Sequence, residues 1–122
     1  MKDFMVINKS KIIILRFRTI NRDIFEAIKT GKKKMETRAA TERFRNIKAG
    51  DTVKLICGKD IFEMKVKKAI IFKSIAAILK KYKPKTINPK THTAKEARDM
   101  WHSFPGYKEK IRKYGLIALE LE

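Results

Sequence analysis

The residues best suited to chemistry lie in one short segment, Gly31 to Arg38, which reads Gly-Lys-Lys-Lys-Met-Glu-Thr-Arg. On a strand, Glu36 and Arg38 share one face with Lys34, whereas Lys33 lies on the other, because side chains alternate along a strand. At a cleft, the Arg38 guanidinium can bind a phosphate or a base edge, and the Glu36 carboxylate can accept a hydrogen bond from an exocyclic amine. The alternative is a solvated row of ion pairs on a surface strand, which contributes little.

The overall charge is unusual. Lysine and arginine total 31 against 13 acidic residues, which gives a formal net charge of +18. Such a surplus is typical of a protein that neutralises the phosphates of a polyanion and so releases its counterions. The alternative is a lineage-wide preference for lysine, since the chain is rich in Lys and Ile and contains no Gln, as in heat-adapted or AT-rich organisms.

One long stretch contains no acidic residue. Met64 to Lys95 has ten lysines and neither Asp nor Glu. Lysines attract phosphates without reading sequence, although cations also favour the C-terminal end of any helix. Two interpretations therefore stand, a solvated surface or a phosphate track formed by Lys65, Lys67, Lys80, Lys81, Lys83 and Lys85.

A second basic cluster follows Arg38. In the triplet Arg43-Phe44-Arg45, the ring can stack on a base while the guanidinium groups hold its phosphates. The alternative is that Phe44 anchors the loop to the core. Lys48 is expected to contact the nucleic-acid backbone on the same rim.

No metal or cofactor site is expected. His92 and His102 are ten residues apart and the single cysteine, Cys57, is far from both, so no zinc-ligand spacing exists. A lone cysteine forms no intrachain disulfide, which fits a reducing cytoplasm. Trp101 is expected in the core, with stacking on a base as the alternative. The N-terminal apolar run, Ile12 to Leu15, is too short for a signal peptide or a membrane span.

The elements that must position these residues follow from hydrophobic periodicity. Ile12 to Arg18 is predicted to be a strand, and Ile20, Ile24 and Ile28 are expected on one face of a helix that stops at Gly31. The segment before Lys11 is either a frayed lead-in or an edge strand. The other predicted elements are a strand over Lys34–Arg38, a polar loop over 39–50, a strand over Val53–Cys57, a hairpin turn at Gly58, a strand over Ile61–Phe72, a helix capped by Ser74, a loop marked by Pro84 and Pro89, a helix capped by Thr93 and Glu96, a helical turn over Lys108–Lys113 and a strand over Leu116–Leu121.

These elements predict an α+β fold. Phe62, Met64, Val66, Ile70 and Phe72 are expected on one face of the long strand. Five strands around one core predict a small mixed, mainly antiparallel β-barrel with peripheral helices. The chain forms a single domain, 1–122, with its core at about 11–121.

The ordered motifs resemble one family. The segment from Gly31 to Arg38, the turn at Gly50 and Asp51 that leads into a strand, and the ending Tyr-Gly-Leu-Ile-Ala-Leu at 114–119 resemble the ASCH (activating signal cointegrator homology) family. The resemblance spans roughly 12–121 and implies a PUA-like barrel whose cleft takes RNA or a nucleotide-like ligand. It implies that Gly31, Lys33, Glu36 and Arg38 line that cleft, and that Gly50 and Asp51 shape the turn beside it.

The family also contains enzymes. One bacterial branch removes the acetyl group from N4-acetylcytidine, and Lys33 matches its catalytic lysine. Its catalytic threonine falls where this chain has Glu36, and Thr37 points to the opposite face of a strand. Its acidic partner falls in the stretch that has no acid. Other members are nucleases, but no metal-ligand cluster supports that chemistry here.

The sequence thus predicts an RNA-binding domain in the cytoplasm and favours a binding protein over an enzyme. The alternatives are an enzyme acting on a modified nucleoside with Lys33 as base or nucleophile, a nuclease, or a protein-interaction module whose basic face meets an acidic partner.

Overall fold

Five strands form one curled sheet that makes a half-barrel. A computed structural model describes residues 10–122, in which the strands lie in the order β1-β3-β4-β5-β2. Only β1 and β3 are parallel, and the other three pairs are antiparallel. The α+β class and the barrel-like, mainly antiparallel architecture predicted above are confirmed. The strands are β1 (Ile12–Arg16), β2 (Met35–Ala39), β3 (Thr52–Cys57), β4 (Asp60–Phe72) and β5 (Leu116–Leu121).

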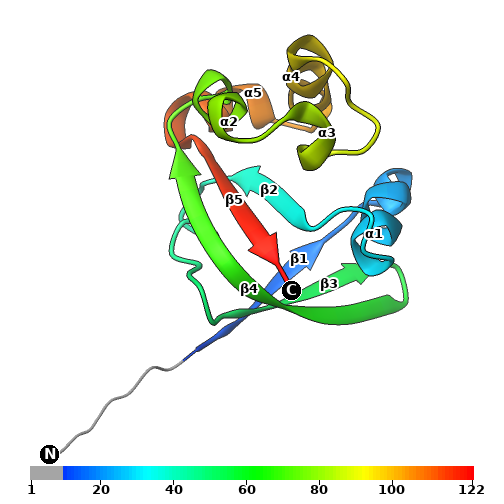
Figure 1. Cartoon of the computed structure of the whole chain (residues 1–122). Helices are drawn as coiled ribbons and strands as arrows, with labels where there is room; N and C mark the ends of the chain where they lie inside the picture. Colours follow the sequence, from blue (N-terminus) through cyan, green and yellow to red (C-terminus); the bar gives the residue numbers. More distant parts are fainter. Residues whose placement is uncertain (1–9) are drawn as a thin grey trace, which may run out of the picture.

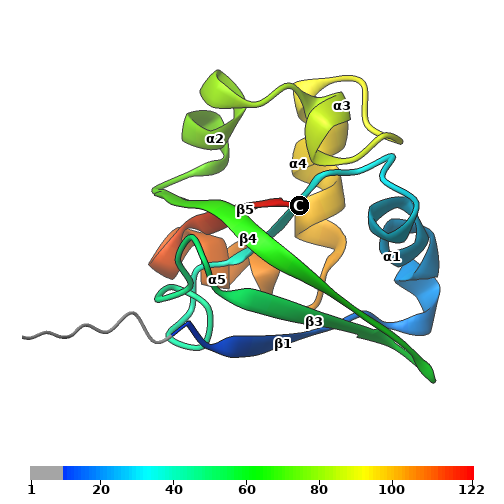
Figure 2. The same ribbon diagram turned by 60° about the horizontal axis from the view of Figure 1, so that its bottom comes forward.

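The helices cover two places on the sheet. Four of them gather on one side of the half-barrel, and α1 lies apart beside the end of β1 (Figures 1 and 2). A short 3-10 turn, Thr19–Asn21, leads from β1 into α1. The helices are α1 (Arg22–Lys29), α2 (Ile75–Lys81), α3 (Pro84–Ile87), α4 (Ala94–Ser103) and α5 (Tyr107–Tyr114).

Strand β5 separates two apolar cores. Ile117 and Leu119 point into the half-barrel, where they pack with residues such as Leu15 and Phe25. Leu116 and Ala118 point the other way and pack against the helical side, where Trp101 is fully buried. Burial of one large apolar side chain contributes about 1.5–3 kcal/mol, so a strand buried on both faces holds the barrel and the helices together.

The long strand β4 does not keep one face throughout. Its pairing with β5 shifts between Val66 and Lys68, which is a β-bulge. Before the bulge, Phe62 packs on the barrel core, whereas Phe72 after it packs on the helical side. The prediction of a single apolar face along β4 is therefore wrong, because one extra residue reverses the alternation.

The predicted helix after β1 begins two residues later than expected. Ile20 lies in the 3-10 turn and is 77% exposed, so its assignment to the buried face is wrong. Phe25 and Ile28 are the buried residues of α1 instead. The preceding strand also ends at Arg16 rather than Arg18.

The predicted caps are present, and one predicted loop contains a helix. The side chain of Ser74 accepts a hydrogen bond from the Ala77 amide at the start of α2, and Thr93 and Glu96 form the expected capping box. Pro84 does not mark a loop but occupies the first turn of α3, where its fixed φ favours helix. Residues 40 to 50 form a loop with helical turns, as predicted, although Ala39 still belongs to β2.

Gly115 is required where α5 meets β5. Its φ is +80°, and a Cβ built there would lie 2.2 Å from the carbonyl oxygen of Phe72. No other residue type fits so close to the β4 backbone.

Within residues 10–122, no helix combines the length and the apolar character needed to cross a bilayer. The predicted lead-in before Lys11 falls mostly outside these residues.

Candidate functional site

A pocket lies at the open seam of the half-barrel, between its edge strands β1 and β2. Arg16, Phe17 and Arg18 reach it from the end of β1, and Glu36, Thr37 and Arg38 reach it from β2. The cavity has a volume of about 150 Å³. We call it the seam pocket; its remaining lining residues are Asn21, Ile24, Lys33, Ile87, Asn88, Met100, Phe104, Pro105 and Tyr107.

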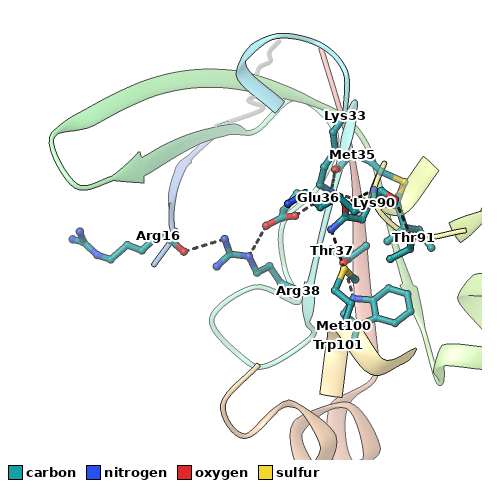
Figure 3. A network of polar contacts seen from close by, with 12 residues as sticks. Arg16, Lys33, Met35, Glu36, Thr37, Arg38, Lys90, Thr91, Met100 and Trp101 are labelled. Atoms are coloured by element: carbon teal, nitrogen blue, oxygen red, sulfur yellow. Dashed lines mark hydrogen bonds and ion pairs between the residues drawn. The ribbon is translucent and has the colours of Figure 1, made fainter. Parts of the chain in front are cut away.

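Arg38 spans the seam. Its Nε donates to Glu36 Oε2 over 3.0 Å, and its Nη2 donates to the carbonyl oxygen of Arg16 over 3.1 Å (Figure 3). The guanidinium also lies 4.7 Å from the ring centroid of Phe17 and 5.8 Å from that of Phe44. Arg38 thus links two strands that form no ladder with each other, and it carries its charge to the pocket wall.

Lys33 is buried and fully hydrogen-bonded. Its Nζ donates to the carbonyl oxygens of Met35 over 2.5 Å and Ile87 over 2.7 Å, and it lies 3.3 Å from Glu36 Oε1. Burial lowers the pKa of Lys33, and the Glu36 carboxylate opposes that shift. An ammonium has three N–H donors, so these three acceptors use all of them.

Glu36 sits between two cations inside the fold. Its side chain is 8% exposed, and each carboxylate oxygen faces a different cation, Lys33 or Arg38. The alternative of a solvated surface row is therefore wrong. Lys34, the expected partner of Glu36, is exposed. Lys33 pairs with Glu36 instead, because it lies before β2 and its side chain does not follow the alternating directions of a strand.

The pocket carries a surplus of positive charge. Its lining residues include Arg18, Lys33 and Arg38 against one carboxylate residue, Glu36. Arg16 turns its carbonyl toward Arg38, whereas its side chain points away from this cluster (Figure 3). Both Arg16 and Arg18 are exposed. Sequence reasoning missed both residues, although their alternation with apolar residues at the end of β1 was a usable signal.

Helices α4 and α5 supply the opposite wall. Trp101 is 0% exposed, and its Nε1 donates to Thr37 Oγ1 over 2.9 Å. Trp101 is therefore a core residue, and the alternative of stacking on a base is wrong. Burial raises the pKa of Tyr107, which lines the pocket. No local pattern indicated that Tyr107 or Asn88 reaches this site, because only folding brings α3 and α5 to β2.

The second basic cluster lies outside the pocket lining. Arg43, Arg45 and Lys48 are exposed, and Arg45 donates to the carbonyl oxygen of Ala40. Phe44 packs on the barrel core, which supports its role as an anchor of the loop. None of these four residues lines the seam pocket, although the Phe44 ring lies 5.8 Å from the Arg38 guanidinium.

The predicted turn residues have structural roles. Gly50 has a φ of +95°, and the buried carboxylate of Asp51 accepts hydrogen bonds from the backbone amides of Lys11 and Lys48. This turn precedes the start of β3, which pairs with the start of β1, whereas the pocket lies at the end of β1. Gly50 and Asp51 do shape a turn, but the prediction that this turn lies beside the cleft is therefore wrong. Gly31, with a φ of +83°, ends α1 and does not line the pocket either.

The lysines of the proposed phosphate track are exposed. They lie on β4 and in the α2–α3 region, and none of them lines the pocket. The six residues are Lys65, Lys67, Lys80, Lys81, Lys83 and Lys85. Lys90, also in the acid-free stretch, forms an ion pair with Asp23.

The remaining candidates for chemistry do not assemble. Cys57 is fully buried, and His92 and His102 are exposed. In the part of the chain from residue 10 onward, no three His, Cys, Asp or Glu side chains lie close enough to hold a metal ion.

The fold and the pocket define a small α+β half-barrel protein with a cationic pocket at the open seam of its sheet. The crystal structure of hypothetical protein PH0355 is similar, with a TM-score of 0.72 and 29% sequence identity over 93% of this chain and 98% of that chain. The solution structure of protein PF0455 from Pyrococcus furiosus is similar too, with a TM-score of 0.70 and 29% identity over 91% of this chain and 96% of that chain. No family model and no curated protein matches the sequence.

Proposed function

We propose that this chain is an RNA-binding domain of the ASCH type, in which the seam pocket receives one nucleotide of a single strand. The observation that carries the proposal is that Arg18 and Arg38 line one hollow beside the buried Lys33–Glu36 pair. Ionised donors bind phosphate and base edges strongly. The net charge of +18 adds an attraction for polyanions over the whole surface.

The size of the pocket fits a single ring. Its volume of about 150 Å³ is below the roughly 300–1,000 Å³ of pockets that enclose a drug-sized ligand. A longer strand must therefore run outside it, where exposed lysines such as Lys85 can neutralise phosphates. The pocket supplies position, and the lysines supply affinity.

The geometry favours binding over catalysis. A lysine that acts as a base or nucleophile needs a free lone pair, but the Lys33 ammonium donates to two carbonyl groups and faces Glu36. Turnover of N4-acetylcytidine by the wild type, lost in Lys33→Ala, would replace the binding proposal with an enzymatic one.

Salt-dependent binding tests the proposal. We expect the affinity for a fluorescent single-stranded RNA, measured by anisotropy, to fall with salt at a log-log slope of about −3.5 if about five phosphates are neutralised. A flat salt dependence would refute it. Release of the RNA by an acidic protein partner but not by excess tRNA would support the protein-interaction alternative.

Two arginine variants locate the site. Arg38→Ala and Arg18→Ala each remove a charged donor of the pocket, and we expect each to weaken binding about ten-fold or more. Because Arg18 is exposed, we expect Arg18→Ala to fold normally. It therefore still tests the site if Arg38→Ala does not fold. Arg112→Ala is the matched control, because Arg112 pairs with Glu109 outside the pocket lining. Equal losses in all three variants would show that charge acts without a pocket.

A further inference from the structure

The β2–β5 ladder determines which backbone groups of β2 face the seam. The Ala40 amide donates to the Gly115 carbonyl, and the Leu121 amide donates to the Lys34 carbonyl. Both pairs follow the antiparallel register of β2 with β5. Because hydrogen-bonded pairs alternate in such a ladder, the even-numbered residues of β2 direct their N–H and C=O toward β5. The odd-numbered residues Met35, Thr37 and Ala39 direct theirs toward the free edge.

The carbonyl groups of two of these three residues are already engaged. The Met35 carbonyl accepts from Lys33 Nζ over 2.5 Å, and the Ala39 carbonyl accepts from the Thr41 amide over 2.8 Å. The carbonyl groups on both sides of Thr37 along the edge are therefore occupied.

The Thr37 peptide groups remain open. No hydrogen bond joins its N–H or C=O to any residue from 10 to 122, although the residue is 6% exposed and lines the seam pocket. Figure 3 shows Thr37 between the Lys33–Glu36 pair and Trp101, and the Trp101 indole N–H donates to the Thr37 hydroxyl. Buried backbone groups are almost always paired, so a donor and an acceptor left open side by side in a pocket wall indicate a ligand.

We propose that the N–H and C=O of Thr37 bind the Watson–Crick edge of one unpaired nucleobase; this rests on the proposed function and specifies its ligand. Every base presents a donor beside an acceptor on that edge, and single-stranded RNA is read there. The base enters edge-first toward β2. Its faces lie against apolar side chains of the pocket such as Ile24, Met100 and Phe104.

A base fits this edge better than a peptide strand does. Strand addition uses a row of alternate residues along an edge, but Lys33 and Thr41 occupy the carbonyl groups on both sides of Thr37. Of Met35, Thr37 and Ala39, only Thr37 keeps its carbonyl open beside its N–H, and this donor–acceptor pair matches one base. The cationic lining also favours a nucleotide phosphate over a neutral peptide.

The inference predicts a preference for single strands. In a duplex, the Watson–Crick edges are paired with each other and cannot reach Thr37. Attraction by surface lysines alone would favour the duplex, because its phosphates are more closely spaced. An RNA of fixed length should therefore bind more tightly as a single strand than after its complement is added.

Amide resonances of the wild-type protein test the contact directly. Nitrogen-15-labelled protein is titrated with each of the four nucleoside 5′-monophosphates, and with ribose 5-phosphate as the probe that has no base. We expect the Thr37 amide proton to move downfield with at least one nucleotide and to stay in place with ribose 5-phosphate. Methylation of the Watson–Crick edge of that nucleotide should abolish the shift, whereas the Ala39 amide should move less.

The outcomes separate this inference from the proposed function. If single-stranded RNA binds with the expected salt slope but saturating nucleotide leaves the Thr37 amide unmoved, base reading by β2 is wrong and RNA binding stands. Equal shifts with ribose 5-phosphate would also overturn it, since phosphate alone would explain them. If an extended peptide shifts the Met35, Thr37 and Ala39 amides together, the edge is a strand-addition site instead. Failure of both RNA and nucleotides to bind would overturn both proposals.

Discussion

Replacement of Glu36 by glutamine should reveal how strongly the fold depends on the pocket carboxylate. Glutamine keeps the shape of the side chain and removes its charge, which leaves the Lys33 ammonium buried with no counterion. The Lys33 and Arg38 nitrogens lie 3.3 and 3.0 Å from the carboxylate. At an effective dielectric constant of about 20, each attraction amounts to roughly 5 kcal/mol before desolvation is subtracted.

The net effect is smaller than this sum, because folding removes all three groups from water. Removal of one partner from a buried ion pair typically destabilises a protein by about 3–5 kcal/mol. We therefore expect Glu36→Gln to lower the free energy of unfolding by about 4 kcal/mol. At ~4 °C per kcal/mol for a chain of this size, the Tm falls by about 16 °C.

The assay is urea denaturation followed by circular dichroism, with a matched variant beside it. Glu26→Gln makes the same chemical change in an exposed pair, where Arg22 and Glu26 are 3.4 Å apart and both side chains are about 40% exposed. We expect this control to unfold like the wild type. Equal stability of Glu36→Gln and Glu26→Gln would refute the reasoning that the Lys33–Glu36–Arg38 cluster is a buried charged unit.

The pH dependence gives a second readout of the same variant. The pKa of Lys33 in the folded protein lies below its ordinary value of 10.5 because of burial, and Glu36 is the main influence that raises it. Glu36→Gln should therefore lower the folded pKa further. Between the folded pKa and 10.5 the unfolded chain binds more protons, so stability rises with pH through that window. The stability difference between variant and wild type should therefore shrink as the pH rises from 7 toward 10.5; a constant difference would show that Lys33 does not cause it.

Two further substitutions test the scaffold around the pocket. Gly115→Ala should destabilise the protein by more than about 3 kcal/mol in thermal or urea unfolding, because the added Cβ would clash with the Phe72 carbonyl in a backbone region that almost only glycine adopts. Gly50→Ala is the control and should cost clearly less, because no atom lies within 4 Å of the added Cβ. Similar losses in the two variants would contradict the packing argument. Trp101→Phe removes the indole that donates to Thr37, and we expect a loss of about 1–3 kcal/mol. Since Trp101 is the only tryptophan, its native fluorescence should be blue-shifted and protected from acrylamide, whereas strong quenching would contradict its burial.

Some of the candidate site was predictable from local sequence. Lys33, Glu36 and Arg38 line one pocket, as the Gly31–Arg38 segment indicated. The pairing of Glu36 with Lys33 instead of Lys34 was not predictable, because it depends on where β2 begins. The loop cluster around Phe44 was misplaced, since residue type alone does not show which way a loop turns.

The sequence by itself determined the order and type of most elements, because hydrophobic period, caps and turns are local properties of the chain. The strands, the capping box at Thr93 and the chain reversal at Gly58 belong to this class. The tertiary structure alone decided that the barrel stays open between β1 and β2, that Arg38 spans the gap to Arg16, and that the Thr37 peptide groups face the pocket. These features depend on strand register and on packing between residues far apart in the chain, and such long-range relations leave no periodic signal in a single sequence.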